Sequence, residues 1–339
     1  MLLRQIFYVP VILVFMQNTS RADLPNDPLL SQQWYLSKIN LPKVWDMQLK
    51  ISEVVVAIID TGMDLEHEDL KNNLWINTLE ISNNKIDDDN NGYVDDINGW
   101  DFQGNDNIPM DEDRTNTGHG TIAGGVIGAV AQNSIGISGM GTSIKLMVIR
   151  AFDAQGLSTG QIISNAIDYA VANGAQLINA SFGGYKNSDT ELIIKAVERA
   201  QKKDVVFVAA AGNFGESNDD KEFFPGNLRF DNVITVAACG PDDTKWVGSN
   251  YGSHNVDISA PGINIFTTKL GNTYGAVTGT SIATPVIAGV AALMKSVAPH
   301  LSSKSIKAIL LNTGVPVSIE TVCNCRVDAF EAIKAVMNQ

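Results

Sequence analysis

Residues 53–60 read Glu-Val-Val-Val-Ala-Ile-Ile-Asp, and this stretch decides the fold. A continuous β-branched run is typical of a strand that is buried on both faces. Comparable runs recur further along the chain at 144–149, 176–180, 205–211 and 233–238. Helical patterns lie between them at 159–173 and 189–203. Strands that alternate with helices predict an α/β fold, a mostly parallel sheet with helices on both faces.

Two further segments shape this expectation. Residues 281–297 are nearly all apolar and end before Pro299, which predicts a helix in the centre of the fold. Residues 72–117 form the one long irregular stretch, too long for a plain connection and therefore expected to be functional. The chain shows no internal repeat and no low-complexity linker, so we expect one domain over residues 23–339.

The composition excludes several classes of protein. With 339 residues and 45% hydrophobic content, the chain can bury a large core and is not a disordered protein. Lys and Arg number 24 against 37 Asp and Glu, a net charge of −13. Phosphate would repel such a chain, so we expect no nucleic-acid partner. Ten carboxylates fall in 87–113 with no basic residue between them, which indicates a solvated surface or a cation site.

The N-terminus has the pattern of a secretory signal peptide. Arg4 precedes the apolar run 6–16, and small residues stand at Ser20 and Ala22, where a signal peptidase reads the chain. The run is about half of the ~20 residues that span a bilayer. A buried N-terminal helix is the alternative, which Pro10 disfavours. We expect cleavage after residue 22, a secreted or periplasmic protein, and no membrane-spanning stretch thereafter.

The three cysteines, Cys239, Cys323 and Cys325, are too few and too oddly numbered for a disulfide framework. One short-range bridge and an unpaired buried thiol both remain open. Stability is therefore expected to come from the size of the core and from bound metal.

Three residues stand where parallel α/β sheets place their functional groups, beyond strand ends and at helix starts. Asp60 closes the first buried strand, His119 enters a helix of small residues, and Ser281 begins the apolar helix. Each alone has an ordinary explanation as a turn residue, a surface histidine or a helix cap. Together they supply what a hydroxyl nucleophile needs, a base within reach and an acceptor that orients this base.

The sequence motifs around these residues, in the chain order Asp, His, Ser, resemble those of the subtilisin-like serine proteases, the subtilases. The matching segments are Asp60-Thr61-Gly62, Gly118-His119-Gly120-Thr121, Ser181-Phe182-Gly183-Gly184, Ala209-Ala210-Ala211-Gly212-Asn213 and Gly279-Thr280-Ser281-Ile282-Ala283-Thr284-Pro285. The resemblance runs over about 26–295 and implies the three-layer subtilisin-like fold. An α/β-hydrolase would need the order Ser, Asp, His, and a dinucleotide site would need a strand before Gly118.

The resemblance assigns a role to each residue. Ser281 would be the nucleophile, His119 the general base and then acid, and Asp60 the group that orients His119. Asn213 would donate its amide to the oxyanion. Substrate would pair with a strand on each side and place a side chain near small residues; this set is Ser181, Phe182, Gly183, Gly156, Leu157, Ala211 and Gly212. Many secreted relatives carry a propeptide, and we expect no recognisable one here.

The resemblance also implies structural Ca²⁺. Asp27, Asp69 and Asn133 would supply side-chain oxygens, with backbone carbonyls from Ala131, Ile135 and Ile137. Six to eight oxygens is the coordination that a hard cation prefers. An ordinary surface loop with incidental carboxylates is the alternative.

Residues 87–93 offer a second cation site. The sequence Asp-Asp-Asp-Asn-Asn-Gly-Tyr fits the opening of an EF-hand-type loop, with glycine at the sharp turn. Asp87, Asp89 and Asn91 would be ligands, completed by the Tyr93 carbonyl and by Asp95 or Asp96. Asn98 stands where such a loop places its bidentate Glu, so the match is partial, and a solvated acidic loop remains open.

These observations predict a secreted serine endopeptidase that hydrolyses peptide bonds through an acyl-enzyme. Its partners would be protein or peptide substrates, and we expect a monomer. A processing protease of narrow specificity is one alternative. A peptide-binding pseudoprotease is the other, and it would have no need of the full set Asp60, His119, Asn213 and Ser281.

Overall fold

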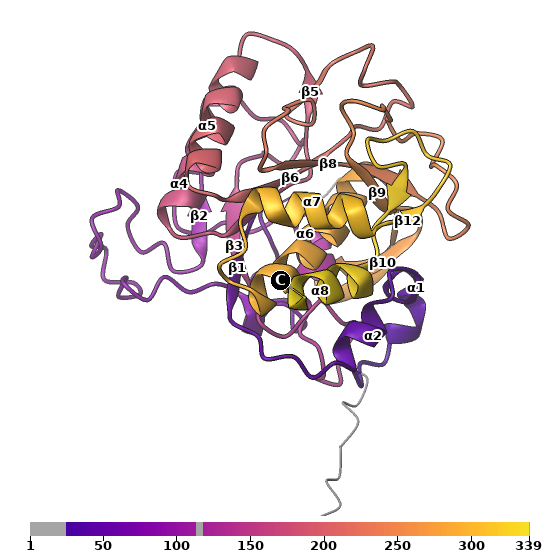
Figure 1. Cartoon of the computed structure of the whole chain (residues 1–339). Helices are drawn as coiled ribbons and strands as arrows, with labels where there is room; N and C mark the ends of the chain where they lie inside the picture. The colour runs from indigo at the N-terminus through magenta and orange to yellow at the C-terminus, as the bar shows by residue number, and fades with distance from the viewer. Residues whose placement is uncertain (1–24, 113–117, 339) are drawn as a thin grey trace, which may run out of the picture.

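The continuous apolar run forms strand β1 (Val54–Asp60), which lies in the interior of the main sheet. Val54 and Val56 are buried in the core on one face of the sheet, whereas Ala57 and Ile59 are buried in the core on the other. Successive side chains of a strand point to opposite faces, so a strand covered on both sides must be apolar throughout. The predicted α/β fold is confirmed (Figure 1).

The structure is a computed structural model that describes residues 25–112 and 118–338. The expected signal peptide, residues 1–22, lies outside the described residues. Within them, the strands of the main sheet are β1, β2 (Gly99–Asp101), β3 (Ile144–Arg150), β4 (Leu177–Ala180), β6 (Val206–Ala210), β8 (Val233–Cys239), β9 (Ile258–Pro261), β12 (Val315–Pro316) and β13 (Cys325–Arg326). Two antiparallel pairs stand apart from it, β5 (Gly184–Tyr185) with β7 (Phe223–Phe224) and β10 (Ile265–Lys269) with β11 (Thr273–Val277).

The described helices are α1 (Trp34–Lys38), α2 (Leu41–Trp45), α3 (His119–Gly128), α4 (Gly160–Ala172), α5 (Thr190–Lys202), α6 (Thr280–Val297), α7 (Ser303–Thr313) and α8 (Ala329–Met337), with 3₁₀ turns at Leu30–Gln32 and Lys71–Asn73. The three helices that were predicted with both ends, at 159–173, 189–203 and 281–297, match α4, α5 and α6 to within about a residue at each end. Helices α4 and α5 cover one face of the sheet. Helices α3 and α6 cover the other, with α8 packed against the outside of α6 (Figure 1).

The main sheet has the order β12-β13-β9-β8-β6-β4-β1-β3-β2, and every neighbouring pair is parallel except β12 with β13. After β1 the chain forms β2 at the edge of the sheet and then α3 on one face before it reaches β3; it next crosses the other face through α4 to reach β4. Loops that leave neighbouring strands toward opposite faces open a crevice at the carboxyl ends of these strands. This crevice is the place where Asp60 ends β1.

Helix α6 is long and apolar enough, by length and composition, to cross a membrane, contrary to the expectation that no later stretch would be. However, 89% of the helix is buried inside the fold, where it packs against β1, β4, β6, β8 and β9. It is the predicted central helix.

Both open alternatives for the cysteines occur in the structure. Cys323 and Cys325 form a disulfide with a 5.0 Å separation of their Cα atoms. Cys239 is a free, buried thiol at the end of β8, and burial raises its pKa to about 12. A thiol held neutral in this way is unreactive at physiological pH.

Candidate active site

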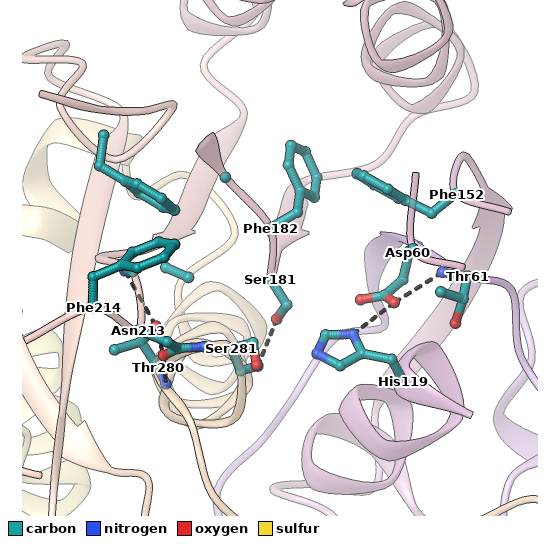
Figure 2. A pocket seen from close by; sticks show the side chains of 15 residues that line it. Asp60, Thr61, His119, Phe152, Ser181, Phe182, Asn213, Phe214, Thr280 and Ser281 are labelled. Atoms are coloured by element: carbon teal, nitrogen blue, oxygen red, sulfur yellow. Dashed lines mark hydrogen bonds and ion pairs between the residues drawn. The ribbon is translucent and has the colours of Figure 1, made fainter. Parts of the chain in front are cut away.

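Asp60 and His119 form a hydrogen-bonded pair in the crevice at the carboxyl end of β1. Asp60 is the last residue of β1 and is buried, while His119 is the first residue of α3 and is half-buried. The Nδ1 atom of His119 lies 2.8 Å from Oδ1 of Asp60 (Figure 2). A carboxylate accepts hydrogen bonds only, so this contact assigns the proton to Nδ1 and leaves the lone pair of the neutral ring on Nε2.

A second carboxylate, which the sequence motifs did not include, stabilises the two chain segments that carry this pair. Asp111 is buried, and its Oδ1 accepts a 3.0 Å hydrogen bond from Thr61 Oγ1. Its Oδ2 accepts from both the backbone N–H and the hydroxyl of Thr121, at 3.1 and 2.9 Å. Thr61 in turn accepts from the N–H of Gly120 at 3.1 Å. Asp111 therefore ties the turn after Asp60 to the first turn of α3.

The start of α3 approaches the end of β1 closely, and this approach requires a glycine at position 120. A Cβ atom on Gly120 would lie 1.9 Å from the carbonyl oxygen of Gly62 and 3.1 Å from Cβ of Asp60. The start of α3 can therefore approach the end of β1 only without a side chain at this position.

Ser281 is the second residue of α6, where the helix N-terminus offers unpaired N–H groups and the positive end of its dipole. Its carbonyl oxygen accepts a 2.7 Å hydrogen bond from the hydroxyl of Ser181, the residue after β4. His119 and Ser281 lie on facing sides of one cavity of about 320 Å³ (Figure 2). The structure thus brings the three expected catalytic residues to one place.

Thr280, the first residue of α6, orients the side-chain amide of Asn213. Its Oδ1 accepts from the backbone N–H of Thr280 at 2.9 Å and from the hydroxyl of Thr280 at 2.8 Å. The Nδ2 donor consequently faces the cavity beside Ser281 (Figure 2). A methyl group placed on Gly279 would be 3.2 Å from Ser281 Oγ and 3.6 Å from Asn213 Nδ2, so these two atoms border the same small space.

Most of the expected substrate-binding residues line this cavity, namely Gly156, Ser181, Phe182, Gly183 and Gly212. Leu157 lines an adjoining cavity of about 220 Å³, which Gly156, Phe182 and Gly183 also border. Ala211 is different. It is fully buried against Ala237 and Val256, while Ala210 faces the cavity in its place. Successive residues of an extended chain point to opposite sides, so residues 210 and 212 can face the substrate only if 211 does not.

Aromatic residues also line the cavity, and the sequence analysis did not single them out. Phe152, Phe214 and Phe223 border it together with Phe182. Phe214 is 59% exposed, which places an apolar ring at the mouth of the cavity. None of the sequence motifs quoted above includes these three positions, so the sequence alone did not predict them.

Away from the cavity, the structure brings together the three side chains of the first expected group of calcium ligands, Asp27, Asp69 and Asn133. Oδ1 of Asp27 accepts from the N–H of Asn133 at 3.1 Å, and Oδ1 of Asp69 accepts from the Asn133 amide at 2.8 Å. Oδ2 of Asp69 accepts from the N–H of Ile137 at 2.9 Å, and Ile135 donates to Asn133 Oδ1 at 2.7 Å. Ala131 directly precedes Gln132, whose N–H donates to Asp27.

The electrostatics of this group suit a cation. Both carboxylates are buried, Asp27 at 4% and Asp69 at 0% exposure. Burial, with a smaller contribution from the charge of Asp27, raises the pKa of Asp69 from 3.8 to about 6. Two buried carboxylates close to each other destabilise their ionised forms, and a bound divalent cation would remove that penalty.

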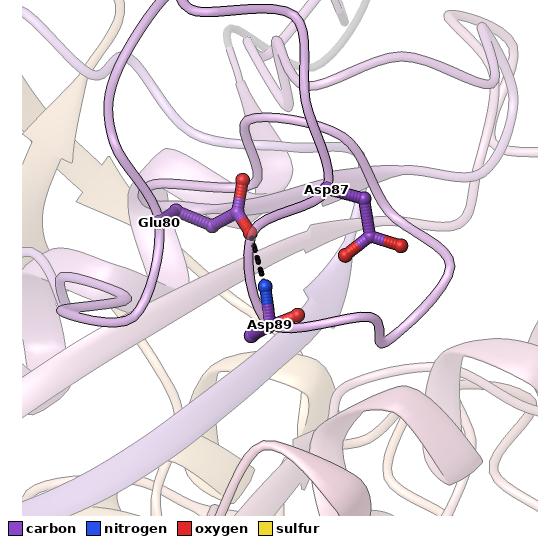
Figure 3. Close-up of side chains that lie close together, drawn as sticks. All are labelled: Glu80, Asp87 and Asp89. Carbon is purple, nitrogen blue, oxygen red and sulfur yellow. Dashed lines mark hydrogen bonds between the residues drawn. The ribbon is translucent and has the colours of Figure 1, made fainter.

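The second acidic group differs in membership from the expected one. Carboxylate oxygens of Asp87, Asp89 and Glu80 lie within 4.8 Å of one another (Figure 3). Asn91 donates to both aspartates from its backbone, at 3.1 and 3.0 Å. Glu80 was not predicted because it precedes the motif, and it also accepts from the N–H of Asp89 at 3.1 Å. These three carboxylates could hold a metal ion.

The remaining expected members of this second group have other contacts. Asp95 accepts from the backbone N–H groups of Asn84 and Lys85, at 3.1 and 3.0 Å, and therefore caps a neighbouring turn. Tyr93 donates its N–H to Asn91 Oδ1 at 2.8 Å, and its ring packs edge-on against Trp100 and Tyr169.

Comparisons with known proteins agree with this geometry. The model of the subtilase family matches residues 52–326. Thermitase of Thermoactinomyces vulgaris is 35% identical over 314 residues, which cover 91% of this chain and 99% of thermitase. Halolysin of Haloferax mediterranei is 32% identical over 91% of this chain and 54% of its own length.

Subtilisin-like protease 1 of Plasmodium falciparum is 32% identical, and the match spans 84% of this chain but less than half of that protein, 44%. Among solved structures, a protease from Pseudoalteromonas arctica superposes with a TM-score of 0.76 at 28% identity and covers 93% of this chain and 100% of its own. The match of the family model over most of the chain shows that the protein belongs to the subtilase family and is a serine-type endopeptidase.

Proposed function

We propose that this chain is a secreted endopeptidase that hydrolyses peptide bonds through an acyl-enzyme, with Ser281 as nucleophile, His119 as base and Asp60 as its orienting partner. One observation carries the proposal. A half-buried histidine paired with a buried aspartate, a serine at a helix N-terminus and an oriented amide donor all border one cavity. This set satisfies the needs of a weak nucleophile for a base and of that base for a fixed tautomer.

The first chemical step follows from the assigned proton positions. Ser281 Oγ forms a bond to the carbonyl carbon of the scissile peptide as its proton passes to Nε2 of His119. Asp60 stabilises the resulting imidazolium through the 2.8 Å contact at Nδ1. The amide of Asn213 and the N–H of Ser281 donate to the oxygen that becomes negative.

The second half of the reaction reuses the same groups. His119 gives its proton to the leaving amine as the carbon–nitrogen bond breaks, which leaves the acyl group on Ser281. A water molecule then attacks the ester carbon as His119 accepts its proton. His119 returns this proton to Ser281 Oγ as the bond between the carbonyl carbon and Oγ breaks, and the carboxylic acid product leaves. Protein or peptide substrates would lie in the cavity between 181–183 and the segment that holds Gly156, which suits an extended peptide backbone.

We propose Ca²⁺ as a structural ion at two places. The first would use Asp27, Asp69 and Asn133 with the carbonyls of Ala131, Ile135 and Ile137. The second would use Asp87 and Asp89 with Asn91 and with Glu80, which the structure adds to the group. Both donor sets are built from oxygens, the ligands that calcium prefers, and calcium would supply charge neutralisation there and no chemistry in the cavity.

Export is supported by the sequence pattern of residues 1–22, and we propose that residues 23–339 act as one catalytic domain in a monomer. The decisive experiment uses a serine-directed phosphonate. It should label the wild type and leave Ser281→Ala unlabelled, and only the wild type should cleave casein. A wild type that binds peptides but neither cleaves nor reacts would instead show a peptide-binding pseudoprotease.

A further inference from the structure

The substrate side chain next to the scissile bond has a defined place in the cavity. In the acyl-enzyme the carbonyl carbon is bonded to Ser281 Oγ, and its oxygen faces Asn213. The side chain of the same residue begins one bond away from that carbon. It must therefore enter the part of the cavity beside Ser281, between the segment 181–183 and the segment 210–212. This inference rests on the proposed function and concerns its substrate class.

The ring of Phe223 already occupies the space between these two walls. A methyl group placed on Gly183 would lie 2.3 Å from Cε1 and 2.9 Å from Cζ of Phe223. A methyl group placed on Gly212, in the opposite wall, would lie 3.3 Å from Cδ1 of the same ring. One aromatic ring thus lies in the slot between both glycines; on the Gly212 side, Asn250 Nδ2 is also close, 2.6 Å from the same methyl position.

The backbone of Phe223 is held firmly in this position. Strand β7 pairs with β5, which places Phe223 opposite Tyr185. The N–H of Phe223 donates to Asn227 Oδ1 at 2.9 Å, and its carbonyl accepts from the N–H of Asn227 at 2.8 Å. These bonds fix the direction in which the side chain leaves the strand.

Away from the cavity, the ring also packs against other aromatic side chains. It is 4% exposed and lies in a cluster with Tyr185 and Phe214, at centroid distances of 5.9 and 6.0 Å. Lys221 lies 3.9 Å above the ring of Tyr185, and Tyr185 donates a 2.5 Å hydrogen bond to Glu216, so the cluster is itself supported. A side chain packed in this way cannot swing aside without disrupting its neighbours.

We propose that Phe223 is the specificity-determining residue of this enzyme and that it restricts the residue before the scissile bond to small side chains, Gly, Ala or Ser. The ring forms the floor of a shallow pocket, and the glycines at 183 and 212 form its sides. A substrate with Leu or Phe at this position would overlap the ring.

The test measures kcat/KM on four tetrapeptide anilides that differ only in their last residue, Gly, Ala, Leu or Phe. Active enzyme is counted by titration with a small serine-directed phosphonate. For the wild type we expect Ala to exceed Phe by at least tenfold. The variant Phe223→Gly opens the slot, so the Phe substrate should rise by at least tenfold while the Ala substrate changes little.

Two further variants keep the result interpretable. Phe223→Leu retains more of the core and should give a preference between those of the wild type and Phe223→Gly. Phe230→Gly removes a partly buried ring that lines neither cavity, and it should leave the ratio of Phe to Ala cleavage unchanged. Should Phe223→Gly fail to fold, the four wild-type rates test the preference for small side chains, and Phe223→Leu tests whether the ring causes it.

The outcomes separate this inference from the proposed function. A wild type that reacts with the phosphonate yet cleaves the Phe substrate as fast as the Ala substrate would overturn the role of Phe223 and leave the peptidase intact. An equal shift in the Phe230→Gly control would also overturn it. A wild type that neither reacts nor cleaves any of the four peptides would instead overturn the proposed function.

Discussion

The hydroxyl of Ser181 donates a 2.7 Å hydrogen bond to the main-chain carbonyl of Ser281. Inside an α-helix that carbonyl would accept from the N–H of the fourth following residue, but this residue is Pro285, which has no N–H. Asn179 orients the hydroxyl by donating to it at 2.9 Å. Ser181 therefore completes the first turn of α6, the turn that carries the proposed nucleophile.

The variant Ser181→Ala should lower kcat/KM by about tenfold to a hundredfold, because the partly buried carbonyl of Ser281 loses its donor, a cost of up to about 1–3 kcal/mol, and the turn can relax away from His119. Pro285→Ala restores an N–H donor to the same carbonyl. In the Pro285→Ala background, Ser181→Ala should consequently lose much less activity. A double-mutant cycle of steady-state rates measures this coupling. Strictly additive effects would show that the two residues do not act on the same carbonyl.

Ser281→Ala should lower peptidase activity by roughly 10⁴-fold or more, since the nucleophile is lost and only binding and oxyanion stabilisation remain. The change removes one half-exposed hydroxyl, so the melting temperature and circular dichroism spectrum should stay close to those of the wild type. Retention of full activity in a carefully purified sample would refute the assignment of Ser281.

The main architecture was accessible from the sequence because its determinants are local. Strands buried on both faces appear as unbroken apolar runs, and β1 is the clearest example. Asp60, His119 and Ser281 were accessible for a related reason, because each stands next to glycines and small residues at the end of a strand or the start of a helix.

Contacts between segments that lie far apart in the sequence could not be predicted in this way. Asp111 is one of ten carboxylates in an acidic stretch, and only its position opposite Thr61 and Thr121 distinguishes it. Glu80 joins Asp87 and Asp89 because the loop folds back on itself. Ala211 was expected to border the substrate, but the direction of a side chain at the end of a strand depends on a register that the sequence alone leaves open.

Asn213→Ala should lower kcat by about 10²–10³-fold with little change in KM, the usual effect of removing one oxyanion donor. The Nδ2 donor contributes mainly once the carbonyl oxygen becomes negative, so ground-state binding should be almost unaffected. Steady-state kinetics on a single anilide substrate provide both constants. A rise in KM with unchanged kcat would place Asn213 in substrate binding instead.

The double variant Glu80→Gln with Asp87→Asn should be more stable than the wild type without calcium and less stable than the wild type with calcium. Without calcium, three carboxylates within 4.8 Å repel one another, so removing two charges should raise the melting temperature. With millimolar calcium the wild type gains the binding free energy and the variant does not, so the order should reverse. Thermal unfolding of both proteins in the Ser281→Ala background, with and without chelator, measures this. The same order in both conditions would contradict calcium binding at this loop.

Asp69 should make the stabilisation of this protein by calcium depend on pH. Burial raises the pKa of Asp69 in the calcium-free protein to about 6, so the folded state holds this proton more tightly than the unfolded state does. Without calcium, the contribution of Asp69 is fully present below about pH 4 and is lost as pH rises through 6.

With calcium, the ion stabilises the ionised carboxylate, and this loss should disappear. The melting-temperature difference between calcium and chelator should consequently widen from pH 4 to about pH 7 and then level off. Scanning calorimetry of Ser281→Ala at fixed ionic strength measures this difference. Asp69→Asn is the matched control, because an amide does not titrate and the part of the widening that comes from this group should vanish. A calcium effect of the same size at pH 4.5 and pH 7.5 would show that Asp69 is not a ligand.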